Sequence, residues 1–99
     1  MMYPFLQLDD EVEIVHSNII HTTSGERVRI YIEKPVQGGF NCAECFLPEY
    51  TWENIVGFSK DDIDRFQEII ESTSHLIFRF ARQGGLGNAS NFLSSQLDV

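Results

Sequence analysis

The stretch SKDDIDRFQEIIESTSHLIFRFARQG, at residues 59–84, decides the fold of this chain. It begins with Ser59, a favoured helix N-cap, and Asp62 lies where its carboxylate completes a capping box. Gly84 suits the left-handed position that follows a helix. Between them a mainly apolar seam steps by three and four residues: Ile63, Phe66, Ile70, Thr73, Ile77 and Phe80. The stretch predicts one long amphipathic helix over residues 59–83, its N-cap included.

Strands precede this helix and occupy most of residues 1–58. The clearest is at residues 27–33, where apolar and polar residues alternate with the period of two that is typical of a half-buried strand. We expect it to end at Pro35, which has no backbone N–H for a central ladder. Another strand is predicted over residues 40–47, and either of its faces is apolar enough to point inward.

Two further segments leave alternatives open. In residues 12–20 the apolar positions change from one strand face to the other midway, which indicates a bulge or a strand covered on both faces. Residues 49–57 fit a short fourth strand and a helical turn about equally well.

The chain is therefore predicted to be a single α+β domain over residues 1–99. We expect an antiparallel sheet of three to four strands, the long C-terminal helix packed on it in two layers, and a flexible tail over residues 84–99.

The charge of the chain excludes several kinds of partner. Seven basic and 15 acidic residues give a net charge of -8 in 99 residues. A protein that binds nucleic acid directly needs a basic face for the phosphates, and anionic membranes attract basic segments, so we expect neither partner. No apolar run approaches the ~20 residues that span a bilayer, and the N-terminus lacks the pattern of a signal peptide. We expect a cytoplasmic protein whose two cysteines are reduced.

The most conspicuous motif is the C-x-x-C formed by Cys42 and Cys45. A structural zinc site normally adds a second pair of ligands, whereas the histidines here, His16, His21 and His75, are scattered, and His75 is kept as a weak candidate for a third ligand. In a regular strand, residues three apart also point to opposite faces. We therefore predict two small thiols, no metal site and no cofactor. No nucleophile motif such as G-x-S-x-G occurs, so no catalytic residues are assigned and a non-enzymatic role is favoured.

Two groups of apolar residues are candidates for an interface. Tyr50 and Trp52 form an aromatic cluster that either anchors a partner or fills the gap where the helix meets the sheet; we favour the second role. The predicted sheet also needs a second cover, since segments 12–20 and 40–47 are apolar on both sides. A second copy of the chain would supply it, and the helix seam supports a homodimer. Its interface candidates are Phe66, Ile70, Ile77 and Phe80.

Three functional hypotheses follow from these observations. The first is a small acidic interaction or regulatory module, such as an immunity protein, an antitoxin or an inhibitor, which an acidic surface would steer onto a basic protein. The second is a small-molecule or zinc-binding domain that uses Cys42 and Cys45. The third is an acidic mimic of nucleic acid, with Asp64, Glu68 and Glu71 on one helix face. The predicted element order is common in small bacterial and phage proteins with unrelated roles, so it carries little functional information.

Overall fold

The computed structural model describes residues 2–84 of the chain. Within these residues the chain forms six strands followed by one helix. The strands are β1 (Met2–Gln7), β2 (Glu13–Ser17), β3 (Ile20–Thr22), β4 (Gly25–Val36), β5 (Gly39–Leu47) and β6 (Thr51–Val56), and the helix is α1 (Lys60–Gln83). The α+β class, the antiparallel sheet and the C-terminal helix are confirmed, whereas the prediction of three to four strands was too low. The tail predicted over residues 84–99 lies outside the described residues, except for Gly84.

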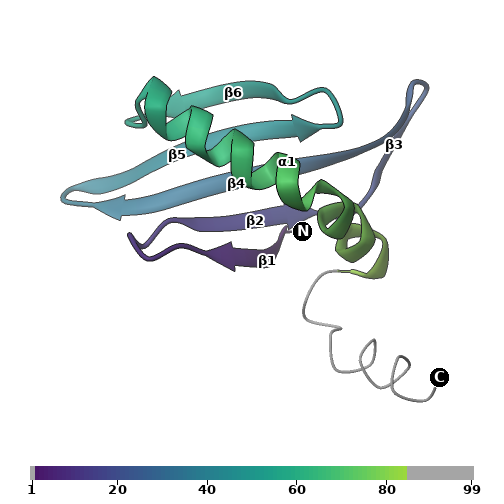
Figure 1. Ribbon diagram of the computed structural model, residues 1–99, viewed down its shortest axis with the longest axis horizontal. Helices are drawn as coiled ribbons and strands as arrows, with labels where there is room; N and C mark the ends of the chain where they lie inside the picture. The colour runs from purple at the N-terminus through teal and green to yellow at the C-terminus, as the bar shows by residue number, and fades with distance from the viewer. Residues whose placement is uncertain (1, 85–99) are drawn as a thin grey trace, which may run out of the picture.

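The sheet is an antiparallel meander in the order β1-β2-β4-β5-β6, and β3 pairs with β4 beside it. Helix α1 crosses one face of this sheet diagonally, from the side of β5 and β6 to the side of β1 and β2 (Figure 1). The other face of the sheet carries no second layer within the described part of the chain. Within residues 2–84 the two-layer arrangement therefore covers one sheet face and leaves the other open.

The predicted strand at residues 12–20 is divided into β2 and β3. Long strand β4 pairs with both, β2 through residues 30–33 and β3 through residues 25–27. At the break, the Ser17 hydroxyl accepts the backbone N–H of Arg29 at 3.0 Å, so that donor keeps a partner where the ladder is interrupted. The predicted irregularity is thus a true interruption, and the open segment at residues 49–57 contains strand β6 rather than a helical turn.

Strand β4 continues past the position where Pro35 was expected to end it. Pro35 is paired with Phe40 of β5, while the pairing of β4 with β2 stops at Glu33. The strand therefore has only one neighbour at Pro35. A missing N–H is tolerated at such a place, because no second ladder needs the donor.

The boundaries of α1 are those that the sequence predicts. The Ser59 hydroxyl accepts the Asp62 N–H at 3.1 Å, and the Asp62 carboxylate accepts the Ser59 N–H at 2.9 Å, which completes the capping box. Gly84 has φ 83°, and its N–H bonds to the carbonyl of Phe80. Acidic side chains in the first turn and Arg82 in the last turn complement the helix dipole. Local sequence alone accounts for both ends of this helix.

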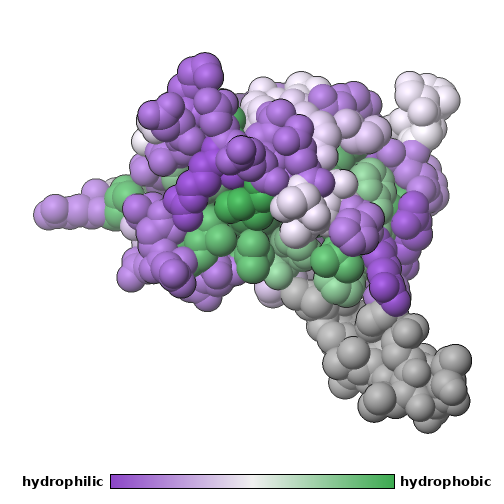
Figure 2. Space-filling model, viewed as in Figure 1, coloured by the Kyte–Doolittle hydropathy of each residue, from purple (hydrophilic) through white to green (hydrophobic). Residues whose placement is uncertain are grey.

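One core lies between α1 and the covered face of the sheet. The helix contributes Phe66, Ile70 and Ile77, each no more than 1% exposed. The strands contribute a matching set of alternating residues: Ile14, Val28, Ile30, Ile32, Ala43, Cys45 and Leu47. Figure 2 shows hydrophobic residues gathered along the helix on this side, with hydrophilic residues around them. No helix in residues 2–84 is both long and apolar enough to cross a membrane.

Candidate interaction surface

The uncovered face of the sheet, called the open face below, consists of the residues that alternate with the buried ones. Its members on the three central strands are Glu13, Val15 and Ser17 of β2, Arg27, Arg29, Tyr31, Glu33 and Pro35 of β4, and Phe40, Cys42, Glu44 and Phe46 of β5. Glu13, Pro35 and Phe40 are exposed, and the others are half-buried by neighbouring side chains of the same chain. Strand β6 adds Thr51 and Glu53, which are paired with Phe46 and Glu44. The face therefore mixes aromatic, aliphatic and charged side chains.

An ion pair lies near the middle of the open face. The Arg29 guanidinium donates from Nη2 to Glu44 Oε1 at 2.5 Å and from Nε to Oε2 at 3.3 Å. The hydrogen bonds from Arg29 hold the pKa of the Glu44 carboxyl below its usual range, and Glu44 in turn raises the pKa of Arg29. Such a two-point contact fixes the arginine side chain on the sheet surface. Arg29 keeps further N–H donors for a partner, because a guanidinium carries five.

One end of the open face is aromatic and basic. The Arg27 guanidinium lies over the Phe46 ring, 4.8 Å from its centroid, and Arg27 Nε is 3.1 Å from Glu49 Oε1. Arginine above an aromatic ring is a pairing that protein interfaces often use. Arg29 is the register partner of Phe46, so this end concentrates the two arginines of the face.

The other end of the open face is acidic. Glu13 of β2 is the direct register partner of Glu33 of β4, and like charges directly opposite each other destabilise a sheet. Tyr31 lies between the two ends, with Val15 and Glu44 as its register partners. Burial, with a smaller effect from a hydrogen bond to Cys42, raises the pKa of Tyr31 to about 12, so the phenol is neutral at physiological pH. Charge thus changes sign along β4 across Tyr31.

The edges of the sheet are less suited to binding than its open face. Edge strand β1 contains Pro4, and its register with β2 shifts between Pro4 and Leu6. Edge strand β6 contains Asn54 at φ 53°, and its register with β5 shifts between Cys42 and Glu44. Proline and bulges are the devices that prevent a further strand from pairing with a sheet edge.

The interface candidates taken from the sequence lie mostly on the covered side. Phe66, Ile70 and Ile77 are buried in the core of the chain itself. Phe80 is half-buried with its ring 6.1 Å from that of Phe5. Tyr50 and Trp52 are half-buried against the same core, and Trp52 Nε1 donates to Gln67 Oε1 of α1 at 2.9 Å. These contacts match the gap-filling role favoured for Trp52, and they leave the helix seam to intramolecular packing.

The cysteines of the C-x-x-C motif lie on opposite faces of β5. Cys45 is fully buried under the helix, and its burial raises its pKa to about 12, so it stays a thiol at neutral pH. Cys42 is half-buried on the open face, and His75 is exposed on the helix. A shared metal ion would need these side chains on one side and the sulfurs as thiolates. In the part of the chain that the structure describes, no group of three or more potential ligands is placed to hold a metal.

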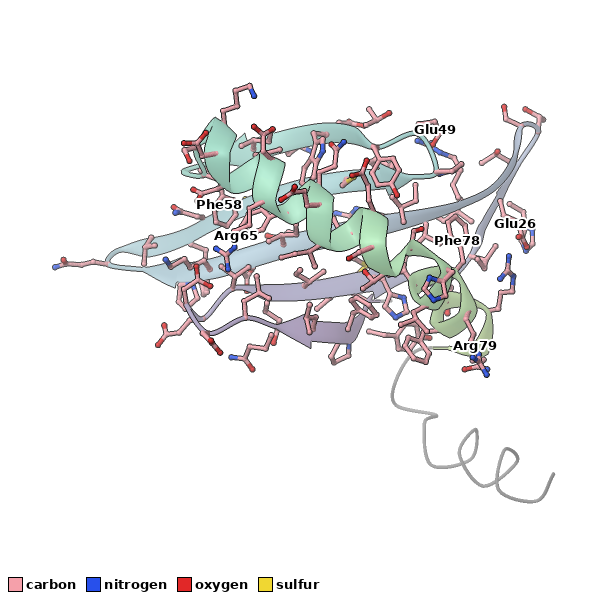
Figure 3. The ribbon with its side chains drawn as sticks, in the orientation of Figure 1. Glu26, Glu49, Phe58, Arg65, Phe78 and Arg79 are labelled. Atoms are coloured by element: carbon pink, nitrogen blue, oxygen red, sulfur yellow. The ribbon has the colours of Figure 1, made fainter. Side chains whose placement is uncertain are left out.

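The outer face of α1 carries the acidic residues considered for nucleic-acid mimicry. Lys60 Nζ lies 2.9 Å from Asp64 Oδ2, so a cation interrupts the acidic ridge. Arg65 and Arg82 lie toward the two ends of the helix and connect it to the sheet side, through Asp10 and Glu26, each at 3.0 Å. Figure 3 shows Glu26 at the β3–β4 hairpin and Arg79 near the helix end. Cations therefore lie among the acidic residues along α1, and this face is not a continuous acidic ridge.

Sequence reasoning missed the residues that make the open face distinctive, chiefly Arg29, Tyr31 and Phe46. A signal was present in the polar side of the strand at residues 27–33, which reads Arg, Arg, Tyr, Glu. Arginine and tyrosine are enriched at interfaces, whereas lysine and glutamate are typical of plain solvated surface. Comparisons with protein-family models, with characterised proteins and with solved structures find no match to this chain. The geometry of the open face is therefore the basis of the functional argument.

Proposed function

We propose that this chain is a small, acidic, non-enzymatic interaction or regulatory module that binds a protein through the open face of its sheet, acting as a homodimer. The observation that carries the proposal is a sheet face that no other element within residues 2–84 covers, on which Tyr31 and Phe46 lie among two arginines. Aromatic residues and arginine supply most of the binding energy in protein interfaces. Immunity proteins, antitoxins and inhibitors are roles that suit a module of this kind.

The rest of the molecule supports the same role. The helix seam and Trp52 are already used in the core, and both sheet edges are interrupted. The open face is thus the surface that we propose for a partner. Its arginines are held by Glu44 and Glu49, so little side-chain entropy is lost when a partner binds.

The proposal is tested by site-specific photo-crosslinking in cells that express the full chain. A photoreactive phenylalanine analogue at position 46 keeps an aromatic ring on the open face, and the same analogue at exposed position 75 on α1 serves as the matched control. We expect a discrete protein adduct, either with a second copy or with another protein, from position 46 only. Equal adducts from both positions, or none from position 46, would contradict the proposal.

A further inference from the structure

The imidazole of His16 lies in the core beside edge strand β1. It is fully buried, and its Nδ1 is 2.8 Å from the carbonyl oxygen of Ser17, so Nδ1 carries the proton of the neutral ring. Nε2 has no hydrogen-bond partner in the described part of the chain. A proton added to Nε2 would therefore create a buried cation whose new N–H finds no acceptor within residues 2–84, and such a group is costly to bury.

The side chains that surround His16 offer no negative charge. Strand β1 presents the rings of Tyr3 and Phe5, with centroids 5.7 and 6.2 Å from that of the imidazole. Strand β4 presents its register partner Ile30, which is fully buried. Helix α1 presents Phe80, whose ring is 6.1 Å from that of Phe5. Tyr3 is the titratable group of this set, and contact of a cation with aromatic rings offsets only part of the hydration that it loses.

The charged side chains at the near end of α1 do not compensate for this burial. Arg79 and Arg82 are exposed, and Arg82 is paired with Glu26. Burial lowers the pKa of His16 and the Ser17 carbonyl raises it in part, and no charged side chain of residues 2–84 acts on it. The ring can therefore be charged at mildly acidic pH only if water reaches it.

Strand β1 is the part of the cover that can leave at least cost. It lies at the edge of the sheet and pairs with β2 alone (Figure 1). None of its residues is fully buried, and its inward rings, Tyr3 and Phe5, are half-buried. Its register with β2 shifts between Pro4 and Leu6, which separates the part beside His16 from the part next to the turn. Helix α1, by contrast, is capped at both ends and has fully buried side chains along its length.

We propose that His16 is a pH-sensitive switch: when Nε2 takes up a proton from solvent, residues 2–5 of β1 separate from β2, water reaches the ring, and the other strands and α1 stay folded. This inference concerns the sheet edge and does not depend on the proposed function of the open face. Separation leaves the outer edge of β2 without a neighbouring strand, and an unpaired edge is able to pair with another chain. Acid thus opens a sheet edge that is closed at neutral pH.

The size of the pH effect follows from the same states. In the separated state His16 is solvated and binds a proton with about its ordinary pKa of 6.5, whereas in the closed state it stays neutral. Each pH unit below 6.5 therefore favours separation by up to about tenfold. The equilibrium constant for separation should be about 25-fold larger at pH 5 than at pH 7.

The test is native-state hydrogen exchange of the full chain, followed by NMR at pH 7 and pH 5 in low concentrations of urea. We expect the amides that bridge β1 and β2 beside His16 to lose about 25-fold in protection at pH 5, after correction for the intrinsic exchange rate. Their exchange should depend little on urea, because a local separation exposes little surface. Amides that bridge β4 and β5 should show the strong urea dependence of global unfolding. Equal urea dependence in both ladders, or unchanged protection of the β1–β2 amides, overturns the inference.

Two substitutions test whether His16 is the group that responds. His16→Leu should remove the change in protection of the β1–β2 amides between pH 7 and pH 5. His75→Gln, at an exposed position on α1, is the matched control and should keep it. A change of the same size in His16→Leu would assign the effect to another group and exclude the switch.

A reversible tether tests the separation of β1 without altering His16. Pro4 and Val15 are register partners, so Pro4→Cys and Val15→Cys in a Cys42→Ser chain place two thiols at a distance that a disulfide spans. In the oxidised chain the urea-insensitive exchange of the β1–β2 amides should be lost, and it should return on reduction. If the oxidised chain keeps this exchange and its pH dependence, β1 does not have to leave and the inference fails.

Discussion

His16 is the buried polar residue of the core, and it was not distinguished from the other histidines by sequence. It is fully buried, and its Nδ1 lies 2.8 Å from the carbonyl oxygen of Ser17, so Nδ1 carries the proton. Nε2 has no hydrogen-bond partner among the described residues. The rings of Tyr3 and Phe5 lie 5.7 and 6.2 Å from the imidazole, centroid to centroid. Burial lowers the pKa of His16, and the Ser17 carbonyl opposes this in part.

This environment predicts a stability that depends on pH. The pKa of His16 is lower in the folded chain than its ordinary value of 6.5, so the unfolded chain binds the proton first as pH falls. Stability should be complete above about pH 6.5 and should decrease below it until the folded pKa is reached. In His16→Leu we expect this slope to disappear between pH 7 and 5, as measured by urea unfolding. The free energy of unfolding at pH 7 should rise by about 1 kcal/mol, because an unsatisfied buried acceptor is removed.

The control for this prediction is His75→Gln, which changes an exposed helix residue and should keep the slope of the wild-type chain. Below about pH 4.5 all three chains should lose stability together. The pKa of Glu44 is lowered in the folded chain, mainly by its hydrogen bond with Arg29, so the unfolded chain binds this proton first and stability falls until the folded carboxyl is protonated as well. A slope between pH 7 and 5 that survives in His16→Leu would exclude His16 as its source.

At the scale of elements, the junction between β6 and the N-terminus of α1 is fixed by several local contacts. The capping box of Ser59 and Asp62 begins α1 immediately after the turn that follows β6. Phe58 precedes the cap and packs edge-on against Phe66 at 5.0 Å, so the direction of the helix is set by a hydrophobic contact as well. Gly57, one residue earlier, has φ 82°. Three consecutive residues thus determine how the chain passes from sheet to helix.

Removal of the cap should destabilise the whole domain. Ser59→Ala leaves the Asp62 N–H without its acceptor, and we expect a loss of about 1 kcal/mol in the free energy of unfolding. Ser72→Ala, in the exposed middle of the same helix, is the matched control and should be neutral or slightly stabilising, since alanine is the better helix former. Chemical unfolding followed by circular dichroism measures both. Equal effects of the two substitutions would show that the cap contributes nothing specific.

Substitution of Gly57 should destabilise the domain, and an experiment can separate the two possible causes. A Cβ at this position would collide with the Asn41 side chain, and the positive φ is unfavourable for any residue with a Cβ. We expect Gly57→Ala to reduce the free energy of unfolding by about 1–2 kcal/mol. Most of that loss should remain in an Asn41→Ala chain, where the collision is relieved but the backbone angle is unchanged. Full recovery in the double variant would assign the effect to the collision instead.

At the scale of the whole molecule, a single core joins one helix to one sheet, so neither should unfold alone. Ile70 is one of the helix residues buried in that core and is 1% exposed. Ile70→Ala should reduce the free energy of unfolding by about 2–5 kcal/mol. Helical circular dichroism and the fluorescence of Trp52, the only tryptophan, should report the same midpoint, because Trp52 bonds from β6 to α1.

The control is Ile55→Ala, which removes the same atoms from a side chain that is 44% exposed on β6. Its effect should be less than 1 kcal/mol. Separate midpoints for circular dichroism and fluorescence in the Ile70→Ala chain would contradict a single cooperative core.

The sequence by itself determined the parts of this protein that depend on neighbouring residues. Helix α1 was predicted with its cap, its buried seam and its final glycine, because capping and the 3.6-residue period act within a few residues. The alternation of residues 27–33 likewise identified the central strand and its inward face. Only the tertiary structure decided which face of β5 is buried, since both are apolar and the choice depends on where α1 packs.

Strand pairing also decided two segments that the sequence left open. Pairing with β5 makes a strand within residues 49–57, and pairing with long strand β4 divides residues 12–20 into the two strands β2 and β3. The environment of His16 and the open face around Tyr31 arise in the same way, from residues that are distant in the chain and adjacent in the sheet. Local propensity cannot select among such contacts, because their free energy comes from surfaces that exist only after the strands have paired.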